Sequence, residues 1–349
     1  MSFLSEVSNK ILSRRGANLN TTGKVEKEKR NLSMKNIAVL GSINIDMITK
    51  VPKIPRENEV VISEGLKLVP GGKATNAAIA MARLGEMVYM TGKIGNDFFG
   101  EQARLTFKKE GVNIEYIDTD SFIPTGTVLV NVDNKGKNTL IVNQDANIRI
   151  NKQTISDFLE KVDRGLIKVD CFYTTLEPLT EIFEFAIKEF KKRKVVIFCD
   201  AAPESRPLPE YLYKYIDFLS ANEFEVTAMT GIKVTNVETA CKAAQYLKER
   251  GANNVIITLG KLGAVLLEKG SNEPIHFPGK KVRVIDETAA GDAFRGGFVS
   301  EYLKNVGLHR SMEFANLTGA FAVTKLGAYD AMPTREELEF LEVLNDKDK

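Results

Sequence analysis

The segment 286–297, DETAAGDAFRGG, joins a turn of small residues to a single carboxylate, Asp292. Thr288 is a candidate N-cap, and an amphipathic helix is expected from Asp292 onward. The first N–H groups of a helix lack intrahelical partners and lie at the positive end of its dipole, where they stabilise phosphate oxygens. The residues whose N–H groups would face such an anion are Ala289, Ala290 and Gly291. A carboxylate beside it could accept a proton during phosphoryl transfer, although an acidic first turn can also simply complement the dipole.

Asn44 and Asp46 could bind a polyol. They follow the apolar run 36–42, and residues two apart in an extended segment face the same side. The amide and the carboxylate could therefore bind neighbouring hydroxyl groups. A turn-forming Asn/Asp pair is the alternative.

The segment 70–85, PGGKATNAAIAMARLG, places a glycine turn before a strongly periodic helix. It lacks the GxxxxGK[ST] spacing of a P-loop, and no GxGxxG follows the first predicted strand. The turn is therefore expected to contact substrate rather than phosphate, unless it is only a glycine turn followed by a helix cap. The candidate residues are Gly71, Gly72, Lys73 and Asn76.

Two segments could bind a nucleotide. In DFLSANEFEVTAMTG, Asn222 and Glu225 lie three residues apart, which suits a water-mediated Mg²⁺ site or, more simply, a capping box. In VIITLGKLGAVLL, Thr258, Gly260 and Gly263 indicate either a glycine turn against a ligand or a structural hairpin.

A small-residue helix in 315–333 is expected to end by Gly327. Its last carbonyl groups would then be free to bind a cation or water.

The composition is that of a folded chain with a small-molecule partner. The 349 residues are 43% hydrophobic and 27% charged, and the net charge of +2 does not indicate a nucleic-acid surface. No apolar run approaches the roughly 18 residues of a membrane span. Three separated cysteines indicate a reducing compartment, and the two histidines do not cluster with them, which disfavours a zinc site or a histidine-based triad. We therefore expect a cytoplasmic protein without nucleic-acid or membrane partners.

Residues 1–34 differ from the rest of the chain. FLSEVSNKILSRRG resembles a weak amphipathic presequence, but Glu6 and later acids are atypical of a transit peptide. We expect an N-terminal extension over 1–34, either disordered or organelle-targeting, and one α/β domain over 35–349.

From residue 35 onward, apolar strand-like runs alternate with helix-period segments, which predicts a mainly parallel sheet covered by helices on both faces. The predicted strands are 36–42, 87–93, 170–175, 195–200, 217–221 and 255–260, and the predicted helices include 74–85, 181–192 and 237–250. Ligands of such sheets bind outside the carboxyl ends of the strands.

Residues 46–69 and 126–143 break this alternation. Both are extended, and the second turns near residues 134–136, so we expect a small β-sheet inserted in the α/β domain. It could act as a lid that excludes water, or be an edge extension without motion.

In this order, the segments resemble the PfkB carbohydrate-kinase family, most closely its ribokinases. GGKATNAAIAMARLG is similar to the first family signature and TAAGDAF to the second, with the Asn222/Glu225 pair between them. The resemblance covers about nine-tenths of the chain and implies a ribokinase-like fold, ATP-dependent sugar phosphorylation, Mg²⁺ and a monovalent cation, usually K⁺.

The resemblance also implies residue roles. Asp292 would be the catalytic base, with Ala289, Ala290, Gly291 and Asp292 forming a backbone anion hole. The sugar would be held by Asn44, Asp46, Gly72, Lys73, Asn76 and Glu177. ATP would contact Asn222, Thr258, Gly260 and Asn316, with Glu225 placing Mg²⁺ through water. The cation would be bound near Asp286, Thr288, Ala322, Lys325 and Gly327.

Five positions depart from the family pattern. Ala74 replaces a glycine and Ala77 a glutamine in the first signature, and Ala331 stands where a serine often completes the cation site. Asp200 stands where asparagine is common, and Arg295 where a small or amide residue is common. These departures concern the sugar pocket and K⁺ dependence more than the reaction.

The expected reaction is phosphorylation of a primary hydroxyl, with D-ribose giving D-ribose 5-phosphate. Open alternatives are 2-deoxyribose, fructose, a keto-deoxy sugar acid or adenosine as substrate, and a non-catalytic sugar- or nucleotide-binding regulator. A nicotinamide-dependent dehydrogenase would also suit the α/β pattern, but the chain lacks the phosphate-binding fingerprint of that class. Exposed strand edges of the lid could pair with a second copy, so a homodimer is expected.

Overall fold

The computed structural model describes residues 34–202 and 207–347. The chain divides into two units, Met1–Ser33 and Met34–Lys349, and the fold described here is that of the second. The expected N-terminal extension lies outside the described residues except for Met34.

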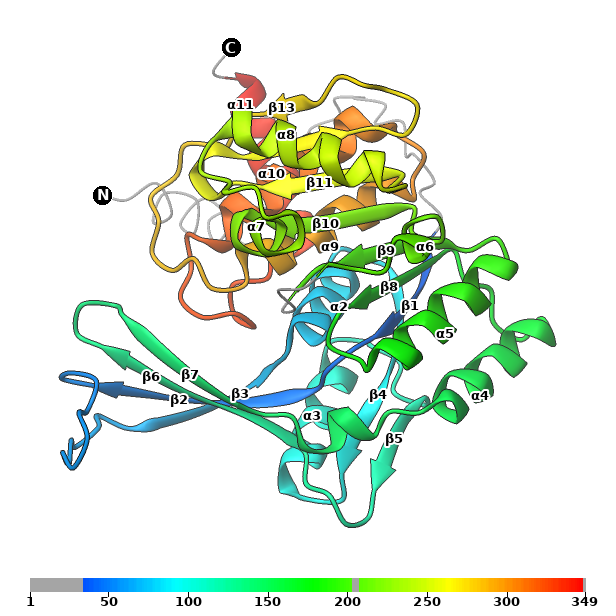
Figure 1. The fold of residues 1–349 in the computed structure, drawn as a ribbon. Coiled ribbons are helices and arrows are strands. Elements are labelled where there is room, and N and C mark those ends of the chain that lie inside the picture. The colour runs from blue at the N-terminus through cyan, green and yellow to red at the C-terminus, as the bar shows by residue number, and fades with distance from the viewer. Residues whose placement is uncertain (1–33, 203–206, 348–349) are drawn as a thin grey trace, which may run out of the picture. The chain divides into compact units, whose positions relative to one another are not determined.

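A nine-stranded sheet forms the centre of the domain (Figure 1). Its strands are β1 (Asn36–Leu40), β4 (Met87–Gly95), β5 (Ile117–Asp120), β8 (Cys171–Thr175), β9 (Val196–Asp200), β10 (Phe218–Asn222), β11 (Asn254–Thr258), β12 (Ala264–Leu267) and β13 (Ile275–Phe277). The order is β13-β12-β11-β10-β9-β8-β1-β4-β5, and only β12 and β13 run antiparallel to their neighbours. The prediction of a mainly parallel sheet is confirmed.

Helices cover both faces of this sheet. They are α2 (Lys73–Arg83), α3 (Phe98–Lys109), α4 (Lys152–Asp163), α5 (Thr180–Lys192), α6 (Glu210–Tyr213), α7 (Glu223–Thr230), α8 (Val237–Glu249), α9 (Ala290–Tyr302), α10 (Leu308–Ala322) and α11 (Arg335–Lys347), with 3₁₀ turns at Asp145–Arg149 and Gly260–Leu262. Successive residues of β1 enter different cores: Ala38 and Leu40 pack with α4, α5, α7 and α8, whereas Ile37 and Val39 pack with α2, α3, α9 and α10. Both faces are apolar because parallel strands are buried on both sides.

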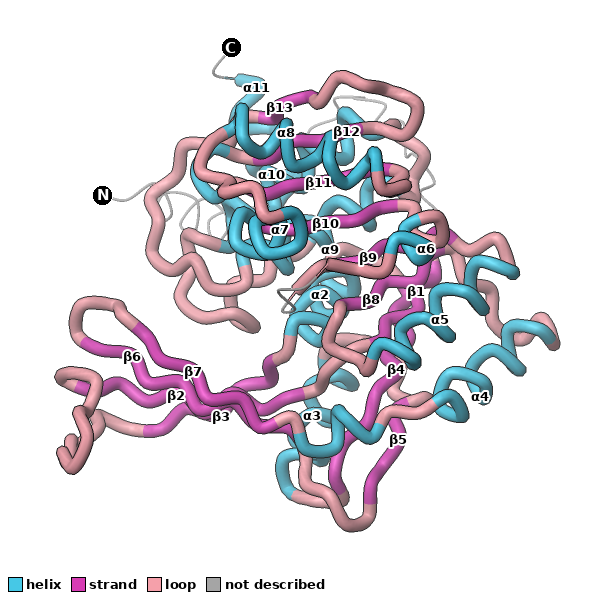
Figure 2. The backbone as a smooth tube through the Cα atoms, in the orientation of Figure 1, coloured by secondary structure: helices cyan, strands magenta, loops and turns pink. Residues whose placement is uncertain are grey.

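A second, four-stranded sheet extends beside α2 and α3 (Figure 2). Its strands are β2 (Asn44–Val51), β3 (Leu66–Gly71), β6 (Gly126–Asp133) and β7 (Asn138–Asn143), in the order β3-β2-β6-β7. The β6–β7 turn lies at residues 134–136, as expected. This sheet begins directly after β1, so its first residues lie at the carboxyl edge of the central sheet, where ligands of such sheets bind.

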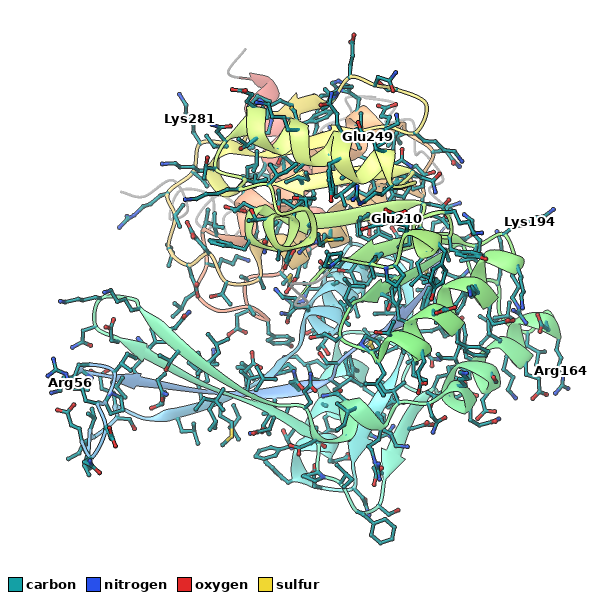
Figure 3. All side chains as sticks on the ribbon, in the orientation of Figure 1. Arg56, Arg164, Lys194, Glu210, Glu249 and Lys281 are labelled. Atoms are coloured by element: carbon teal, nitrogen blue, oxygen red, sulfur yellow. The ribbon has the colours of Figure 1, made fainter. Side chains whose placement is uncertain are left out.

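Charged side chains of both signs lie on the outside of the domain (Figure 3). The labelled residues Arg56, Arg164, Lys194, Glu210, Glu249 and Lys281 are all exposed. Among the described residues, no helix combines the length and apolarity required to cross a bilayer.

Candidate active site

The N-terminus of α9 forms the predicted anion-binding turn. Ala289 is the N-cap residue, has left-handed backbone angles (φ 58°, ψ 13°), and no side chain caps the helix. The prediction of Thr288 as N-cap is therefore wrong, because Ala289 occupies that position. The hydroxyl of Thr288 donates to Oδ1 of Asp286 at 2.6 Å instead. The helix also begins at Ala290, two residues before Asp292. No side chain competes for the N–H groups of the first turn, but that of Ala290 donates to the carbonyl of Glu287 at 3.3 Å. The N–H groups of Gly291 and Asp292, which have no intrahelical partner, can therefore bind an anion.

Asp292 lies in this first turn and is only 2% exposed. Its Oδ2 accepts a hydrogen bond of 2.8 Å from Nδ2 of Asn76 on α2. Burial raises the pKa of Asp292; the positive charge of Lys73 lowers this pKa, and the negative charge of Asp200 raises it again, so that the net shift is upward. A carboxylate with a raised pKa is a stronger proton acceptor than an exposed aspartate, which suits a general base.

Asp46, on β2, interacts electrostatically with Asp292. Burial and then the charge of Asp292 raise the pKa of Asp46 to about 6. Within the described part of the chain, Oδ1 of Asp46 and Oδ1 of Asn76 are buried without a hydrogen-bond partner. A Cβ at Gly71 would lie 2.0 Å from Oδ1 of Asp46, so this glycine leaves room for the carboxylate. Buried acceptors without partners are the groups that hydroxyls of a bound polyol would satisfy.

The side chain of Asn44 at the start of β2 is oriented by Asn147, a residue that sequence reasoning missed. Nδ2 of Asn147 donates to Oδ1 of Asn44 at 2.8 Å and to the carbonyl of Ile43, whose N–H donates back to Oδ1 of Asn147 at 2.8 Å. No pattern in the sequence around residue 147 indicated this contact, which joins residues more than 100 positions apart.

Gly72, Lys73 and Glu177 meet where β1, β8 and α2 come together. Gly72 has φ 98°, and a Cβ there would lie 2.6 Å from the carbonyl oxygen of Ser42. The charge of Asp292 raises the pKa of Lys73, against the effect of burial. Burial raises the pKa of Glu177, whose carboxylate accepts from the N–H of Ser42 at 3.1 Å and interacts with the charge of Lys73. Of the expected sugar residues, Asp46, Lys73 and Asn76 thus interact with Asp292 itself. Glu177 is linked to it through the charge of Lys73.

Asn222 and Glu225 form the capping box that was the simpler alternative. Oδ1 of Asn222 accepts from the N–H groups of Phe224 and Glu225, and Oε2 of Glu225 accepts from the N–H of Asn222 at 2.8 Å. Asn222 also pairs in register with Thr258 on the neighbouring strand. The cap fixes the direction of the Glu225 side chain, and this is compatible with a second role toward a nucleotide.

The structural hairpin that was the alternative at this segment is present between β11 and β12. Gly260 lies in the connecting turn with φ 50° and open space beside it, whereas a Cβ at Gly263 would lie 2.0 Å from the carbonyl oxygen of Phe277. Nδ2 of Asn316 donates to that same carbonyl at 3.1 Å. Thr258 at the end of β11 and Gly260 in the turn that follows thus lie at the hairpin, and Asn316 on α10 bonds to the end of the neighbouring strand β13.

The expected cation residues come from two segments that are bonded to each other. The N–H of Ile285 donates to the carbonyl of Val323 at 2.7 Å. Asp286 accepts from the N–H of Thr288 at 2.9 Å and from the N–H of Gly327 at 2.8 Å. Burial raises the pKa of Asp286, but these hydrogen bonds lower it more, so the carboxylate stays ionised.

The other two expected cation residues flank this contact. Ala322 is the buried last residue of α10. The side chain of Lys325 points elsewhere: its Nζ lies 3.0 Å from Oε1 of Glu337, so only its backbone could contribute a ligand.

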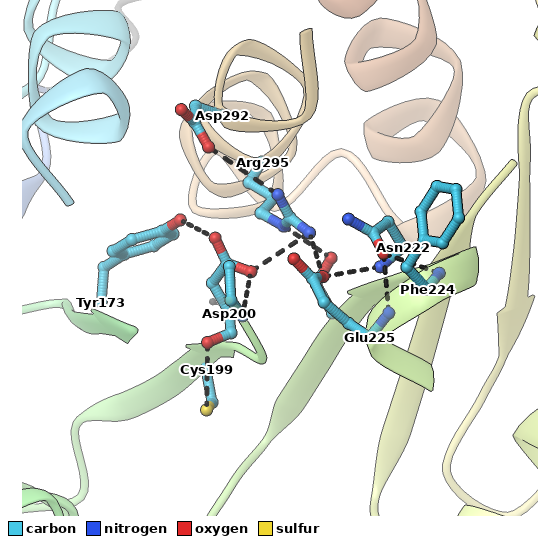
Figure 4. A network of polar contacts seen from close by, with 10 residues as sticks. Tyr173, Cys199, Asp200, Asn222, Phe224, Glu225, Asp292 and Arg295 are labelled. Atoms are coloured by element: carbon cyan, nitrogen blue, oxygen red, sulfur yellow. Dashed lines mark hydrogen bonds and ion pairs between the residues drawn. The ribbon is translucent and has the colours of Figure 1, made fainter. Parts of the chain in front are cut away.

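A buried ionic network surrounds Arg295 on α9, one helical turn after Asp292 (Figure 4). Nη2 of Arg295 is 3.1 Å from Oδ1 of Asp200 and 3.3 Å from Oε2 of Glu225, and its Nη1 is 3.8 Å from Oδ1 of Asp292. The Nε group donates to Oγ of Ser220 at 3.0 Å. Arg295 and Asp200 were recognised only as departures from a family pattern, and their direct contact was not predicted.

Residues 34–335 match the pfkB family carbohydrate kinase. The chain belongs to the PfkB carbohydrate-kinase family. Its curated relatives include the ribokinase of Haemophilus influenzae, 34% identical over 88% of this chain and 99% of the relative. The deoxyribokinase of Salmonella typhi is 29% identical over 89% of this chain and its whole length.

Solved structures agree with this assignment. The Arabidopsis thaliana ribokinase complexed with ribose and ATP is 26% identical, with a TM-score of 0.80 over 88% of this chain and 98% of that one. The predictions of the PfkB family and of a ribokinase-like fold are confirmed. Within this PfkB kinase, the predicted sugar and base residues lie together, while the roles given to them stay predictions.

Proposed function

We propose that this PfkB kinase transfers the γ-phosphoryl group of ATP to the primary hydroxyl of D-ribose, giving D-ribose 5-phosphate. The observation that carries this is the position of Asp292: a buried carboxylate in the first turn of an uncapped helix, bonded to Asn76. That arrangement joins an anion-binding turn and a proton acceptor in a single helical turn. The relatives named ribokinase, and the Arabidopsis structure with ribose and ATP, support ribose as the sugar.

Asp292 would take the proton of the attacking hydroxyl. The N–H groups of Gly291 and Asp292, presented by the left-handed turn at Ala289, would stabilise charge on the oxygens of the transferring phosphoryl group. The N–H of Ala290 donates to the carbonyl of Glu287 at 3.3 Å and would share this bond with the phosphoryl group. Because phosphoryl transfer has a loose transition state, positioning and electrostatic stabilisation should supply most of the acceleration.

The sugar would be held by hydrogen bonds to the groups around Asp292. Among the described residues, Oδ1 of Asp46, Oδ1 of Asn76 and Oγ of Ser42 are buried in this region without a hydrogen-bond partner. The remaining proposed sugar contacts are Asn44, Gly72, Lys73 and Glu177. A site built to hydrogen-bond several hydroxyls rejects analogues that lack one of them.

ATP would lie against the loops around β10 and β11. The proposed contacts are Asn222, Thr258, Gly260 and Asn316. Within residues 34–202 and 207–347, no cluster of three His, Cys, Asp or Glu side chains could hold a metal ion. Mg²⁺ needs no such cluster because it keeps several waters and binds the nucleotide phosphates, and Glu225 would hold one of those waters. When bound, Mg²⁺ neutralises charge on the phosphates.

A monovalent cation, K⁺ by expectation, would be bound by oxygen atoms of the segments 286–288 and 322–327. The fit rests on the hydrogen bond between Asp286 and Gly327, which joins these segments beside α9. The proposed ligands come from Asp286, Thr288, Ala322, Lys325 and Gly327. When bound, the cation adds positive charge near the anion-binding turn.

We propose that the four-stranded sheet is a lid and also the interface of a homodimer. Its inward face carries Asp46, whereas a row of apolar residues crosses its other face. This row is Leu68, Met47, Leu129 and Ile141, and Leu68, Leu129 and Ile141 are exposed. A second copy of the sheet could cover this face and the edges of β3 and β7.

Sedimentation equilibrium tests the proposed homodimer through the mass of the particle in solution. The full chain at micromolar concentration should sediment with twice its own mass, and Ile141→Lys, which places a charge in the apolar row, should shift it toward the monomer. Lys168→Glu, at an exposed position outside this sheet, is the control. A parent chain that is only monomeric would contradict the interface.

The pKa of Asp46 predicts how sugar affinity varies with pH. Its ordinary pKa of 3.8 is raised to about 6, so the carboxylate is ionised above pH 6 and becomes protonated as the pH falls through this value. If the ionised form accepts bonds from sugar hydroxyls, KM for the sugar should be constant above pH 7 and rise about tenfold per unit well below pH 6. KM should lose this dependence in Asp46→Asn, and a KM that is flat down to pH 5 in the parent would rule out the role.

We also propose a cytoplasmic enzyme without nucleic-acid or membrane partners. All three cysteines are free, which is the usual state in a reducing compartment. Surface charges of both signs and the net charge of +2 do not favour a polyanion as partner.

Turnover with ATP across a sugar panel, with and without K⁺, tests the proposed function. The panel should contain ribose, 2-deoxyribose, fructose, a keto-deoxy sugar acid and adenosine. We expect the highest kcat/KM with ribose and faster turnover with K⁺. The deoxyribokinase relative makes 2-deoxyribose the most informative competitor. Absence of sugar-dependent ADP release with every substrate would instead support a binding regulator.

A further inference from the structure

Arg295 is the largest fully buried side chain among the described residues. It lies on α9, one turn after Asp292, and is 2% exposed. Burying a guanidinium is costly unless it is paired and hydrogen-bonded. Here the positive charge meets two acidic residues from other elements, Asp200 at the end of β9 and Glu225 on α7.

Asp200 anchors this guanidinium. It is fully buried, its Oδ2 accepts from the hydroxyl of Tyr173 at 3.2 Å, and its Oδ1 accepts from the N–H of Ala202 at 3.1 Å. Each carboxylate oxygen of Asp200 therefore accepts a hydrogen bond in addition to the ion pair with Arg295. Since Ser220 accepts from Nε, the guanidinium is held from two strands and has little freedom to turn.

The other side of the guanidinium faces the proposed reaction site. Nη1 is 3.8 Å from Oδ1 of Asp292, and a Cβ at Gly291 would lie 2.8 Å from the same nitrogen. Nη2 holds Oε2 of Glu225, the residue proposed to hold a water of Mg²⁺. One side chain therefore contacts the proposed base, the anion-binding turn and the proposed metal-side carboxylate.

We propose that Arg295, anchored by Asp200, is a positioning residue for phosphoryl transfer: it holds Asp292 and Glu225 in place and adds a fixed positive charge beside the anion-binding turn. This inference rests on the proposed function. It also means that Asp200 and Arg295 act as one unit, so the effects of substituting the two residues should not be independent.

Charged and polar groups from several elements face Asp292. They are Lys73 and Asn76 on α2, Asp46 on β2, Asp200 on β9 and Arg295 on α9 itself. Arg295 lowers the pKa of Asp292, whereas Asp200 raises it. Arg295→Gln should therefore raise the pKa of Asp292 and move the acid limb of the kcat profile to higher pH. Asp200→Asn should lower this pKa and move the acid limb to lower pH.

A double-mutant cycle on the full chain tests the pairing. The four proteins are the parent, Asp200→Asn, Arg295→Gln and the double variant, assayed for kcat against pH at saturating ATP and ribose. We expect Arg295→Gln to lose about 10- to 100-fold in kcat, the range found for residues that orient a metal-site ligand. The loss in the double variant should be about 10-fold smaller than the product of the single losses, as for residues in direct contact.

Two further variants keep the outcome interpretable. Arg295→Lys retains a positive charge and should keep the acid limb near that of the parent, even if Arg295→Gln folds poorly. Glu110→Gln breaks a comparable ion pair with Arg83 at the far end of α2 and should leave the kcat profile unmoved. Thermal melting of every variant separates a loss of folding from a loss of turnover.

Two results would overturn the proposal. In the first, the kcat loss of the double variant equals the product of the losses of the two single variants. In the second, the acid limbs of Arg295→Gln and Asp200→Asn shift in the same direction or do not shift. These outcomes differ from a failure of the proposed function, in which the parent itself shows no sugar-dependent turnover. A parent that turns over ribose while Arg295→Gln keeps full kcat would reject the inference alone.

Discussion

Replacing Asp292 with Asn is expected to lower kcat by about two to four powers of ten, the usual contribution of a general base. The Kd for ATP should stay nearly unchanged, because the anion-binding turn consists of backbone N–H groups and keeps its shape. The amide can still accept the hydrogen bond from Asn76, and it removes a buried negative charge close to Asp200. The variant should therefore melt no lower than the parent.

Steady-state kinetics and calorimetric titration of ATP check this result. Asp157→Asn, the same substitution at an exposed position on α4, is the control and should have the kcat of the parent. Turnover of Asp292→Asn within about tenfold of the parent would remove Asp292 from the role of base.

Ala289→Val is expected to lower kcat by about two to three powers of ten, comparable with the loss of an oxyanion-hole donor. Ala289 has φ 58°, and a β-branched residue is a genuine outlier in this left-handed region. The backbone would move toward negative φ and turn the N–H groups of the first turn of α9 away from the phosphoryl position.

Two comparisons separate this effect from lost stability. Ala289→Gly permits the left-handed turn and should lose much less activity than Ala289→Val. Lys194→Val places the same side chain at φ 59° in an exposed turn between α5 and β9, so it should lower the melting temperature while kcat is kept. If Ala289→Val lowers only the melting temperature, the turn does not contribute to catalysis.

Local patterns were sufficient to predict most of the fold. The apolar runs of β1, β8, β9 and β10 are short and bounded by polar or turn residues, so their strand character does not depend on distant contacts. The periodicity of α2, α5 and α8 likewise belongs to each segment alone. The hairpin at 134–136 was predictable because glycine permits the φ of 77° that the turn requires.

The beginning of α9 was predicted less well for a specific reason. Thr288 has the residue type of an N-cap, but Asp286 lies two positions earlier and accepts both its N–H and its hydroxyl. The N–H of Gly327 also donates to the other oxygen of Asp286, at 2.8 Å, so both oxygens of this carboxylate are bonded. One of these bonds comes from a residue 41 positions away, which local propensity does not describe.

The sequence by itself determined the alternation of strands and helices, the family, and the segments that carry the chemistry, because these depend on residue types and short spacings. Only the tertiary structure decided which charges meet. Asn76 and Asp292 are 216 positions apart, and Arg295 lies 95 positions from Asp200 by their numbering, yet each pair is in contact. Such pairings depend on how strands align at the edge of the sheet and on the cost of burying an unpaired charge, and neither is encoded within a single segment.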